Sequence, residues 1–325
     1  MKILICGLGS IGQRHARNLI SLGYEDLYAL RTRKWQLPKE LEKIHQVEDI
    51  GKALKLKPDV VLITNPTSLH LKFALEFAKI GSHLFIEKPL SNTLASVDEL
   101  EEIVGKNKSI AMIGYNFRFH PQLIQIKKIL DEKTIGKIIT VSTMTGEHLP
   151  NWHPTEDYRQ GYSARADLGG GVILTQSHDL DYLYWLIGDY AQIYAQAGKK
   201  SNLEIDVEDT VQMLVKFKNS AFGSLHLDYL QNPPIRQITV VGTKGKVFWD
   251  YYKNYFEVVQ NGKTKKFEKP KKFERNDMYI AEIKYFLECV ENKKQSQITL
   301  SQGKRILEVC LAAKQSARID KKVVL

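Results

Sequence analysis

The sequence predicts an α/β protein: a doubly wound parallel sheet, followed by a second α/β domain with a large, mainly antiparallel open sheet. A glycine-rich loop joins the first predicted strand to the first predicted helix, and short apolar strands then alternate with amphipathic helices. Later segments are rich in strands separated by turn-like residues. We expect the domains to span residues 1–118 and 119–325.

The composition is that of a globular chain of two-domain size, with 325 residues, 43% hydrophobic and 26% charged. Lys and Arg number 47 against 37 Asp and Glu, so the net charge is 47 − 37 = +10. This excess suits anionic ligands such as phosphates. The basic residues are scattered, unlike those of a nucleic-acid-binding arm, so we expect no nucleic-acid partner.

No apolar stretch approaches the ~20 residues that a membrane span requires, so we expect no membrane attachment. Glycines interrupt the N-terminal apolar run too early for a signal peptide. The cysteines, Cys6, Cys289 and Cys310, are too few and too far apart for a disulfide framework or a metal knuckle. We therefore expect a cytoplasmic protein without a metal site.

The glycine-rich loop follows a strand predicted at residues 3–6 and has the G-x-G-x-x-G spacing. Its first glycine permits a tight turn, the second lets a pyrophosphate approach the backbone, and the third lets helix and strand pack closely. Strand, loop and helix in this order predict a Rossmann dinucleotide-binding domain. We expect the cofactor to contact Gly7, Gly9, Ser10, Ile11 and Gly12.

The second predicted strand, residues 26–30, ends where an NAD-specific site places a carboxylate for the ribose hydroxyl. Here Arg31, Thr32 and Arg33 follow instead, and we expect them to contact the cofactor. Guanidinium groups suit a 2′-phosphate, so the sequence favours NADP slightly over NAD. The alternative is that these are ordinary solvated cations and that NAD is used.

Residues 59–64 form a continuously apolar strand, as expected for a strand that is buried on both faces. Asn65 and Pro66 end it and precede a helix whose apolar residues recur at helical spacing over residues 71–78. His70 lies in the first turn of this helix. We expect all three residues near the cofactor, with a helix-capping or packing role as the alternative for His70.

The next strand, residues 84–86, ends in Glu87, Lys88 and Pro89. Ligands bind at the carboxyl ends of strands in an open parallel sheet, so this acid and this lysine are candidates for chemistry. The alternative is a surface Glu-Lys pair. A helix predicted at 94–104 and a strand at 109–114 complete the first domain.

A segment without helical or strand period, residues 147–168, lies early in the second domain. Loops of this length are usually functional or disordered, and the aromatic rings of Trp152 and Tyr158 argue against disorder. Arg159 and Arg165 could bind a carboxylate or phosphate. The segment is either a substrate loop or an ordered surface loop.

Three glycines, 169–171, precede a helix that begins near Ser177. Helical spacing predicts one core face on this helix and places His178, Asp181 and Trp185 on the other side, as the wall of a pocket. Strands follow at 211–217, 222–230, 238–241, 247–249 and 256–259. One face of their sheet should remain free for a partner subunit, with Tyr229 and Trp249 as candidate contacts.

Several motifs occur in a fixed order: the N-terminal glycine loop, NPTSLH, GSHLFIEKPL, GYNFRFHP and GGGVILTQSHDLDYLYWLIG. Together they resemble the glucose–fructose oxidoreductase / inositol 2-dehydrogenase family over essentially the whole chain. The resemblance implies NAD(P)-dependent oxidation of a secondary alcohol of a sugar or cyclitol, or reduction of the matching ketone. It also implies a homodimer or homotetramer formed through the C-terminal sheet.

The same resemblance implies residue roles. Lys88 and His178 match the family's catalytic lysine and histidine, and Glu87 completes the EKP signature. We expect Glu87 and Lys88 to contact the cofactor as well. The residues that we expect to contact the substrate are Lys88, Tyr115, Arg118, Trp152, His153, Tyr158, Arg159, Thr175 and His178.

The sequence departs from the family pattern at one place. Many members carry an aspartate three or four residues before the histidine, whereas Leu174 and Thr175 stand here. Asp179 and Asp181 are candidate substitutes. The departure keeps a second hypothesis open, a cofactor sensor or scaffold without catalysis, and a non-sugar substrate is a third.

The W-H-P…E-D-Y-R pattern of the 147–168 segment resembles a subset of the family associated with surface-sugar biosynthesis. It suggests a nucleotide-linked or acidic amino sugar as the substrate.

Overall fold

The computed structural model describes residues 1–31, 36–152 and 156–325. The chain forms two compact units, one made of Met1–Asn116 with Glu274–Arg305, the other of Phe117–Phe273 with Ile306–Leu325. The first boundary lies two residues before the predicted one. The sequence-based division puts everything after residue 118 into the second domain, whereas Glu274–Arg305 belongs to the first unit.

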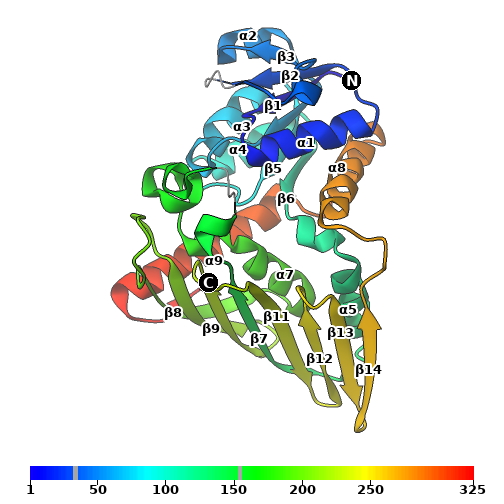
Figure 1. The fold of residues 1–325 in the computed structure, drawn as a ribbon, viewed down its shortest axis with the longest axis vertical. Helices are drawn as coiled ribbons and strands as arrows, with labels where there is room; N and C mark the ends of the chain where they lie inside the picture. The colour runs from blue at the N-terminus through cyan, green and yellow to red at the C-terminus, as the bar shows by residue number, and fades with distance from the viewer. Residues whose placement is uncertain (32–35, 153–155) are drawn as a thin grey trace. The chain divides into compact units, whose positions relative to one another are not determined.

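The first unit is built on a parallel sheet whose six described strands have the order β3-β2-β1-β4-β5-β6 (Figure 1). Its central strands are buried along their whole length, which agrees with the apolar runs in the sequence. The predicted Rossmann-type sheet is thus confirmed. Its strands are β1 (Ile3–Cys6), β2 (Leu27–Leu30), β3 (His45–Val47), β4 (Val60–Ile63), β5 (His83–Glu87) and β6 (Ala111–Gly114).

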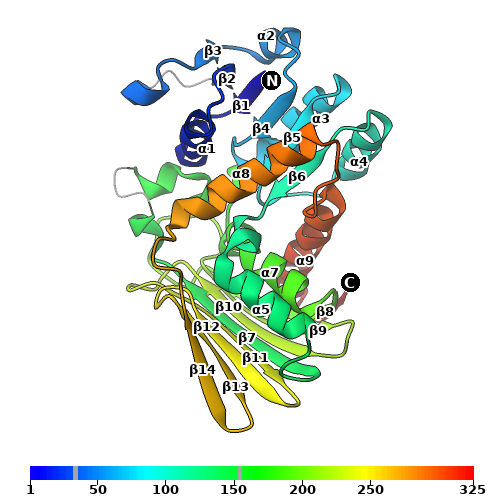
Figure 2. The same cartoon turned by 90° about the vertical axis from the view of Figure 1, so that its right-hand side faces the viewer.

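Helices cover both faces of this sheet, and α8 lies against α1, which explains why this late segment belongs to the first unit (Figure 2). Asn276 of α8 donates a hydrogen bond to Asn18 of α1 at 2.8 Å. The helices are α1 (Ser10–Ser21), α2 (Ile50–Lys55), α3 (His70–Lys79), α4 (Val97–Lys106), α8 (Arg275–Glu291) and the first residues of α9 (Leu300–Ile319).

The register of the parallel strands brings their carboxyl ends to one edge of the sheet. Cys6 pairs with Leu30 on one side and with Ile63 on the other, and Ile63 pairs with Ile86. The residues that follow these positions therefore emerge along the same edge. This edge is where an open parallel sheet binds its ligands.

The second unit contains a sheet whose nine described strands have the order β14-β13-β12-β11-β7-β10-β9-β8-β15. All neighbours are antiparallel except β7 and β10, so the predicted large, mainly antiparallel sheet is confirmed. The strands are β7 (Ile138–Gly146), β8 (Tyr190–Gly198), β9 (Thr210–Phe217), β10 (Phe222–Asp228), β11 (Ile235–Gly242), β12 (Gly245–Asp250), β13 (Tyr255–Gln260), β14 (Lys263–Glu268) and β15 (Val323–Val324).

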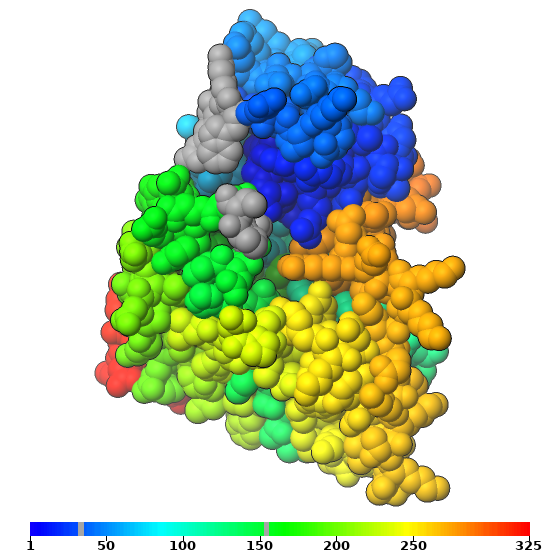
Figure 3. Space-filling view, viewed as in Figure 1, coloured from blue at the N-terminus to red at the C-terminus, as the bar shows by residue number. Residues whose placement is uncertain are grey.

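Helices α5 (Pro121–Asp131), α7 (Ser177–Ile187) and α9 lie on one face of this sheet (Figure 2). The short helix α6 (Val172–Thr175) contacts β9 and β10. On the other face, strand side chains form the surface of the unit (Figure 3). Met144, Leu214 and Phe222 are large apolar residues exposed there, with 43%, 57% and 57% of their surface accessible. None of the described helices is both long and apolar enough to cross a membrane.

The two aromatic residues predicted for the free face, Tyr229 and Trp249, are fully buried, so this prediction is wrong. Trp249 lies on the helix side of β12, where its Nε1 donates a hydrogen bond to Gln122 Oε1 of α5 at 2.9 Å. The ring of Tyr229 meets the ring of Trp152 edge to face, with centroids 5.4 Å apart. A polar partner inside the unit lets the indole N–H be buried without loss of hydrogen bonding.

Candidate active site

The glycine loop between β1 and α1 has little room on one side and open space on the other. Gly7 has φ of 100°, which favours glycine, and a Cβ on Gly12 would lie 2.0 Å from the carbonyl oxygen of Gly7. A Cβ on Gly9 would meet no protein atom within 4 Å. Gly12 therefore permits close packing of the helix, while Gly9 keeps free a space that an anion can enter.

The loop after β4 lies beside this cradle. Thr64 donates its hydroxyl hydrogen bond to the carbonyl oxygen of Gly7 at 2.7 Å, which holds the two strand ends together. The side-chain oxygen and nitrogen of Asn65 are buried and have no hydrogen-bond partner among the described residues. A buried amide normally has a hydrogen-bond partner, so these two atoms, in a loop that packs against Gly7, fit a polar ligand such as a dinucleotide.

Glu87, at the end of β5, points into the interior of the first unit and is 6% exposed. His15 Nε2 of α1 lies 2.7 Å from its Oε1, and the backbone N–H of Lys88 donates to its Oε2 at 3.2 Å. Gly114, paired with Glu87 across the sheet, leaves room for this carboxyl group. Glu87 thus ties the strand end before Lys88 to the helix that follows the glycine loop. Its predicted contact with the cofactor stays a prediction.

The imidazole of His70 joins two loops of the same edge. Its Nδ1 lies 2.9 Å from the carbonyl oxygen of Pro89, and its Nε2 lies 2.9 Å from that of Asn65. Burial lowers the pKa of His70, although both carbonyl groups oppose this shift. The contacts give His70 the packing role that the sequence left open, and its contact with a cofactor stays a prediction.

In the second unit, α7 is buried almost all round, and within it only Tyr184 and Trp185 are partly exposed. The prediction of a single core face is therefore wrong, because α5 and β7 both contact this helix. His178, in its first turn, is 9% exposed. The ring of Phe117 meets that of His178 edge to face, with centroids 5.1 Å apart.

Two buried aspartates, Asp179 and Asp181, follow His178 in α7, and each is bound by an arginine. Arg118 donates two hydrogen bonds to Asp181, from Nε at 3.0 Å and from Nη2 at 2.6 Å. Burial raises the pKa of Asp181, and the guanidinium of Arg118 opposes this shift. Arg118 is therefore bound to an internal carboxylate, and its predicted contact with a substrate stays a prediction.

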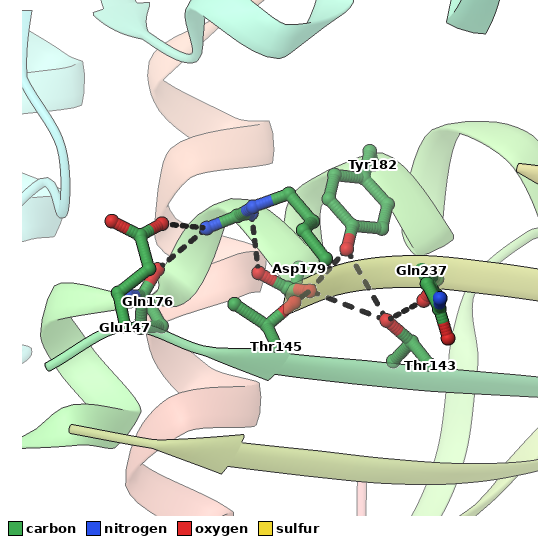
Figure 4. A network of polar contacts seen from close by, with 8 residues as sticks. Thr143, Thr145, Glu147, Gln176, Asp179, Tyr182 and Gln237 are labelled. Atoms are coloured by element: carbon green, nitrogen blue, oxygen red, sulfur yellow. Dashed lines mark hydrogen bonds and ion pairs between the residues drawn. The ribbon is translucent and has the colours of Figure 1, made fainter. Parts of the chain in front are cut away.

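Asp179 is the centre of a polar network between α7 and the sheet (Figure 4). Its Oδ1 accepts hydrogen bonds from Thr145 at 2.6 Å, from Thr143 at 3.3 Å and from the hydroxyl of Tyr182. Its Oδ2 accepts one from Arg236 Nη1 at 2.8 Å. Burial, and then Asp179, raise the pKa of Tyr182 well above its usual range. The carboxyl groups of Asp179 and Asp181 thus both have internal partners, and their role as substitutes for an upstream aspartate stays a prediction.

The 147–168 segment has no α-helix or strand in its described part and is ordered by short 3₁₀ turns. Arg159 binds Asp157 through Nε at 2.8 Å and Glu204 through Nη1 at 3.1 Å. Arg165 binds Asp167 at 2.7 Å. Both guanidinium groups are partly exposed, so an anionic ligand would have to compete with these carboxylates.

The other predicted site residues differ in how far they are exposed. Tyr115 and Thr175 are buried, Arg31 and Tyr158 are partly exposed, and Lys88 leaves the end of β5 partly exposed. Thr32, Arg33 and His153 lie outside the described residues. Lys88 belongs to the first unit and His178 to the second, and their action on one ligand stays a prediction.

Sequence reasoning missed Arg236 as a residue of the site. It stands on β11 (Ile235–Gly242), at the first of three positions, followed by Ile238 and Val240, that face the helices and are buried. A single charge at a core-facing position of an alternating strand is a signal that could have found it, because buried charges need partners. No such signal exists for the contact of His15 with Glu87. In the described ranges, no group of three or more His, Cys, Asp or Glu side chains could hold a metal ion.

The parallel sheet, the glycine cradle and the unpartnered amide of Asn65 define the first unit as a dinucleotide-binding domain. Comparison with known families agrees. Residues 1–115 match the oxidoreductase family with an NAD-binding Rossmann fold, and residues 123–248 match the GFO/IDH/MocA C-terminal domain. The chain belongs to the GFO/IDH/MocA family and is an NAD(P)-dependent oxidoreductase.

Relatives align along the whole chain. Myo-inositol 2-dehydrogenase of Thermotoga maritima is 29% identical, covering 100% of this chain and 98% of its own. Scyllo-inositol 2-dehydrogenase (NAD(+)) of Bacillus subtilis is 27% identical, with 98% and 94% covered. A structure of levoglucosan dehydrogenase with NADH and levoglucosan has a TM-score of 0.89 at 16% identity, covering 100% of this chain and 99% of its own. At this identity the last comparison supports the fold alone.

The two glycines Gly9 and Gly12 provide a test of the cradle. Gly9→Ala should fold like the native protein but bind NADH roughly tenfold more weakly or worse, because its methyl group occupies the space that a diphosphate needs. Gly12→Ala should also lower the melting temperature, because its methyl group meets the Gly7 carbonyl oxygen. NADH fluorescence titration and thermal unfolding measure the two effects. Native-like NADH affinity of Gly9→Ala would contradict the assignment.

Proposed function

We propose that the protein transfers a hydride between a nicotinamide cofactor and a secondary alcohol or ketone carbon of a cyclitol or sugar. The observation that carries this proposal is Lys88, which directly follows β5 at the edge where parallel strands present their ligands. The names of the relatives, inositol 2-dehydrogenases of Thermotoga maritima and Bacillus subtilis, support a polyhydroxylated ring as the substrate.

In the proposed reaction, His178 and Lys88 act on the same hydroxyl group of the substrate in different roles. His178 accepts the hydroxyl proton during oxidation, and the ammonium group of Lys88 holds the same oxygen and stabilises its developing negative charge. In ketone reduction, the pair supplies the proton to the forming alcohol. The nicotinamide ring, when bound, takes or gives the hydride.

Residues around these two groups keep them in place. Glu87 is anchored to His15 beneath Lys88, so the strand end has a fixed course. The edge of the Phe117 ring limits the orientation of His178. An ordinary imidazole pKa of ~6.5 suits proton exchange near neutrality, which supports histidine in this role.

We further propose an acidic or nucleotide-linked sugar as the natural substrate. The support is the 147–168 segment, where Arg159 and Arg165 are partly exposed and now bind carboxylates of the protein itself. A carboxylate or phosphate of a ligand offers a guanidinium group the same bidentate geometry. Myo-inositol and scyllo-inositol are the neutral substrates against which this preference is measured.

Replacing Lys88 tests the proposed chemistry. Lys88→Met should lower kcat by roughly 10²–10⁴-fold and weaken NADH binding far less, because the ammonium group acts mainly on the reacting oxygen. The measurement is absorbance of reduced nicotinamide with a panel of inositols, aldoses, uronic acids and nucleotide sugars. Native-like turnover by Lys88→Met would refute the role. Tight NADH binding by the native protein, with no redox change across the panel, would favour a sensor instead.

We propose NADP as the preferred cofactor. The support is Arg31, a partly exposed cation directly after β2, at the position where NAD-specific sites carry a carboxylate. Arg31→Asp should weaken NADPH binding and strengthen NADH binding, because a carboxylate repels a 2′-phosphate and accepts a ribose hydroxyl. Fluorescence titration with both nucleotides gives the ratio of dissociation constants. A ratio that does not move would exclude Arg31 from this role.

We also propose a homodimer or homotetramer formed through the open face of the second unit's sheet, in a reducing cytoplasm where Cys6, Cys289 and Cys310 stay thiols. Leu214 on β9 and Phe222 on β10 support the interface, because each leaves 57% of an apolar side chain exposed on neighbouring strands. Leu214→Lys should reduce the molar mass in light scattering after size-exclusion chromatography. Ile80→Lys, on an exposed helix end of the first unit, is the control. An unchanged mass for Leu214→Lys would argue against this interface.

A further inference from the structure

We propose that Arg236 is a positioning residue, which fixes the first turn of α7 so that His178 keeps one orientation. The inference rests on the proposed function at one point: the proposed function makes His178 a catalytic residue. Arg236 lies on β11, is 3% exposed, and is 57 residues away in sequence from Asp179, its main partner.

The guanidinium group of Arg236 binds a residue on each side of His178 in the sequence. Its Nη1 donates to Asp179 Oδ2 at 2.8 Å, and its Nη2 donates to Gln176 Oε1 at 2.8 Å. Gln176 and Asp179 are already joined by a backbone hydrogen bond of 3.0 Å, which closes the first helical turn. Arg236 therefore holds this turn at both ends, with His178 between them.

A second set of contacts reaches the imidazole itself. The guanidinium carbon of Arg236 lies 4.6 Å from the centre of the Phe117 ring, and that ring is the edge-to-face neighbour of His178. A cation above an aromatic ring is attracted to it, so Arg236 also restrains Phe117. Arg236 thus contacts both the helical turn that contains His178 and the aromatic ring that packs against the imidazole.

The geometry of the guanidinium group explains why an arginine stands here. Its two terminal nitrogens diverge in one plane and can bind two acceptors at once, whereas an ammonium group is a point charge on a flexible stem. Nearby acids stabilise the charge: burial lowers the pKa of Arg236, but Asp179, Tyr182 and Glu147 raise it above the ordinary value. Arg236 Nη2 also lies 3.5 Å from Glu147 Oε1, at the start of the 147–168 segment.

A purely structural pair would need only Asp179 and Arg236. The carboxylate of Asp179 already accepts bonds from Thr145, Thr143 and Tyr182, so it is well anchored to the sheet. The additional bond to Gln176 fixes the residue two positions before His178. Because Gln176 is uncharged, this hydrogen bond neutralises no charge, and its effect is to restrain the first turn of α7. This favours a positioning role.

The test measures His178 directly and through turnover. The variants are Arg236→Met, which keeps a long side chain without its charge, and Arg236→Lys, which keeps the charge but not the two diverging nitrogens of the guanidinium group. Diethylpyrocarbonate modification of His178, read by peptide mass spectrometry relative to the partly exposed His226, should become several-fold faster in Arg236→Met. In Arg236→Lys the modification rate of His178 should rise less than in Arg236→Met. Turnover should fall by roughly 10–10²-fold in Arg236→Met, with a smaller change in KM.

Two controls separate positioning from folding. Thr239→Val alters the open face of the same strand and should change neither reading. The double variant Asp179→Asn/Arg236→Met removes both buried charges and should recover stability relative to Arg236→Met. If kcat and the modification rate stay altered while the melting temperature recovers, the positioning role holds. Recovery of all three together would overturn it and leave a structural pair.

The two proposals fail in different ways. If the native protein shows no turnover with any polyol, the proposed function is lost, and the modification rate of His178 still decides whether Arg236 positions it. If turnover is normal in every Arg236 variant and His178 is modified at the native rate, the positioning role is refuted and the proposed function stands.

Discussion

Two ion pairs inside the second unit, Asp179 with Arg236 and Asp181 with Arg118, hold the helix that carries His178. A carboxylate that is shielded from water must be neutralised or hydrogen-bonded, and removal of one partner of such a pair costs about 3–5 kcal/mol. A turn or shift of the helix would therefore break these bonds. The two arginines, on β11 and in the turn before α5, thus join the helix that carries His178 to neighbouring elements.

The first unit also contains a buried carboxylate, and its partner is a histidine. Glu87 is buried at the end of β5 and lies 2.7 Å from His15 Nε2, while His70 joins the loops after β4 and β5. These contacts connect the helix behind the glycine loop with the strand end that carries Lys88. Both units thus hold their candidate catalytic residue by buried polar contacts one residue away in sequence.

The sequence predicted the parts of the site that follow from local chemistry. Gly7, Gly9 and Gly12 were recognised by their spacing, and the structure gives each a distinct steric surrounding. The prediction for Trp249 failed because alternation along a strand says that one face is buried but not which one, and the prediction for Tyr229 failed because β10 ends one residue before it. Asp179 and Asp181, which the sequence offered as substitutes for the upstream aspartate, are both bound to arginines from distant parts of the chain.

The sequence alone determined that strands alternate with helices in the first unit, the glycine cradle and the strand-end position of Lys88, because hydrophobic period and turn chemistry act over a few residues. Only the tertiary structure decided that α8 returns to the first unit, and that Arg236 meets Asp179 across 57 residues of chain. Such pairings depend on which faces the whole fold buries together. A buried charge selects its partner by position in space, and the sequence around it carries no record of that position.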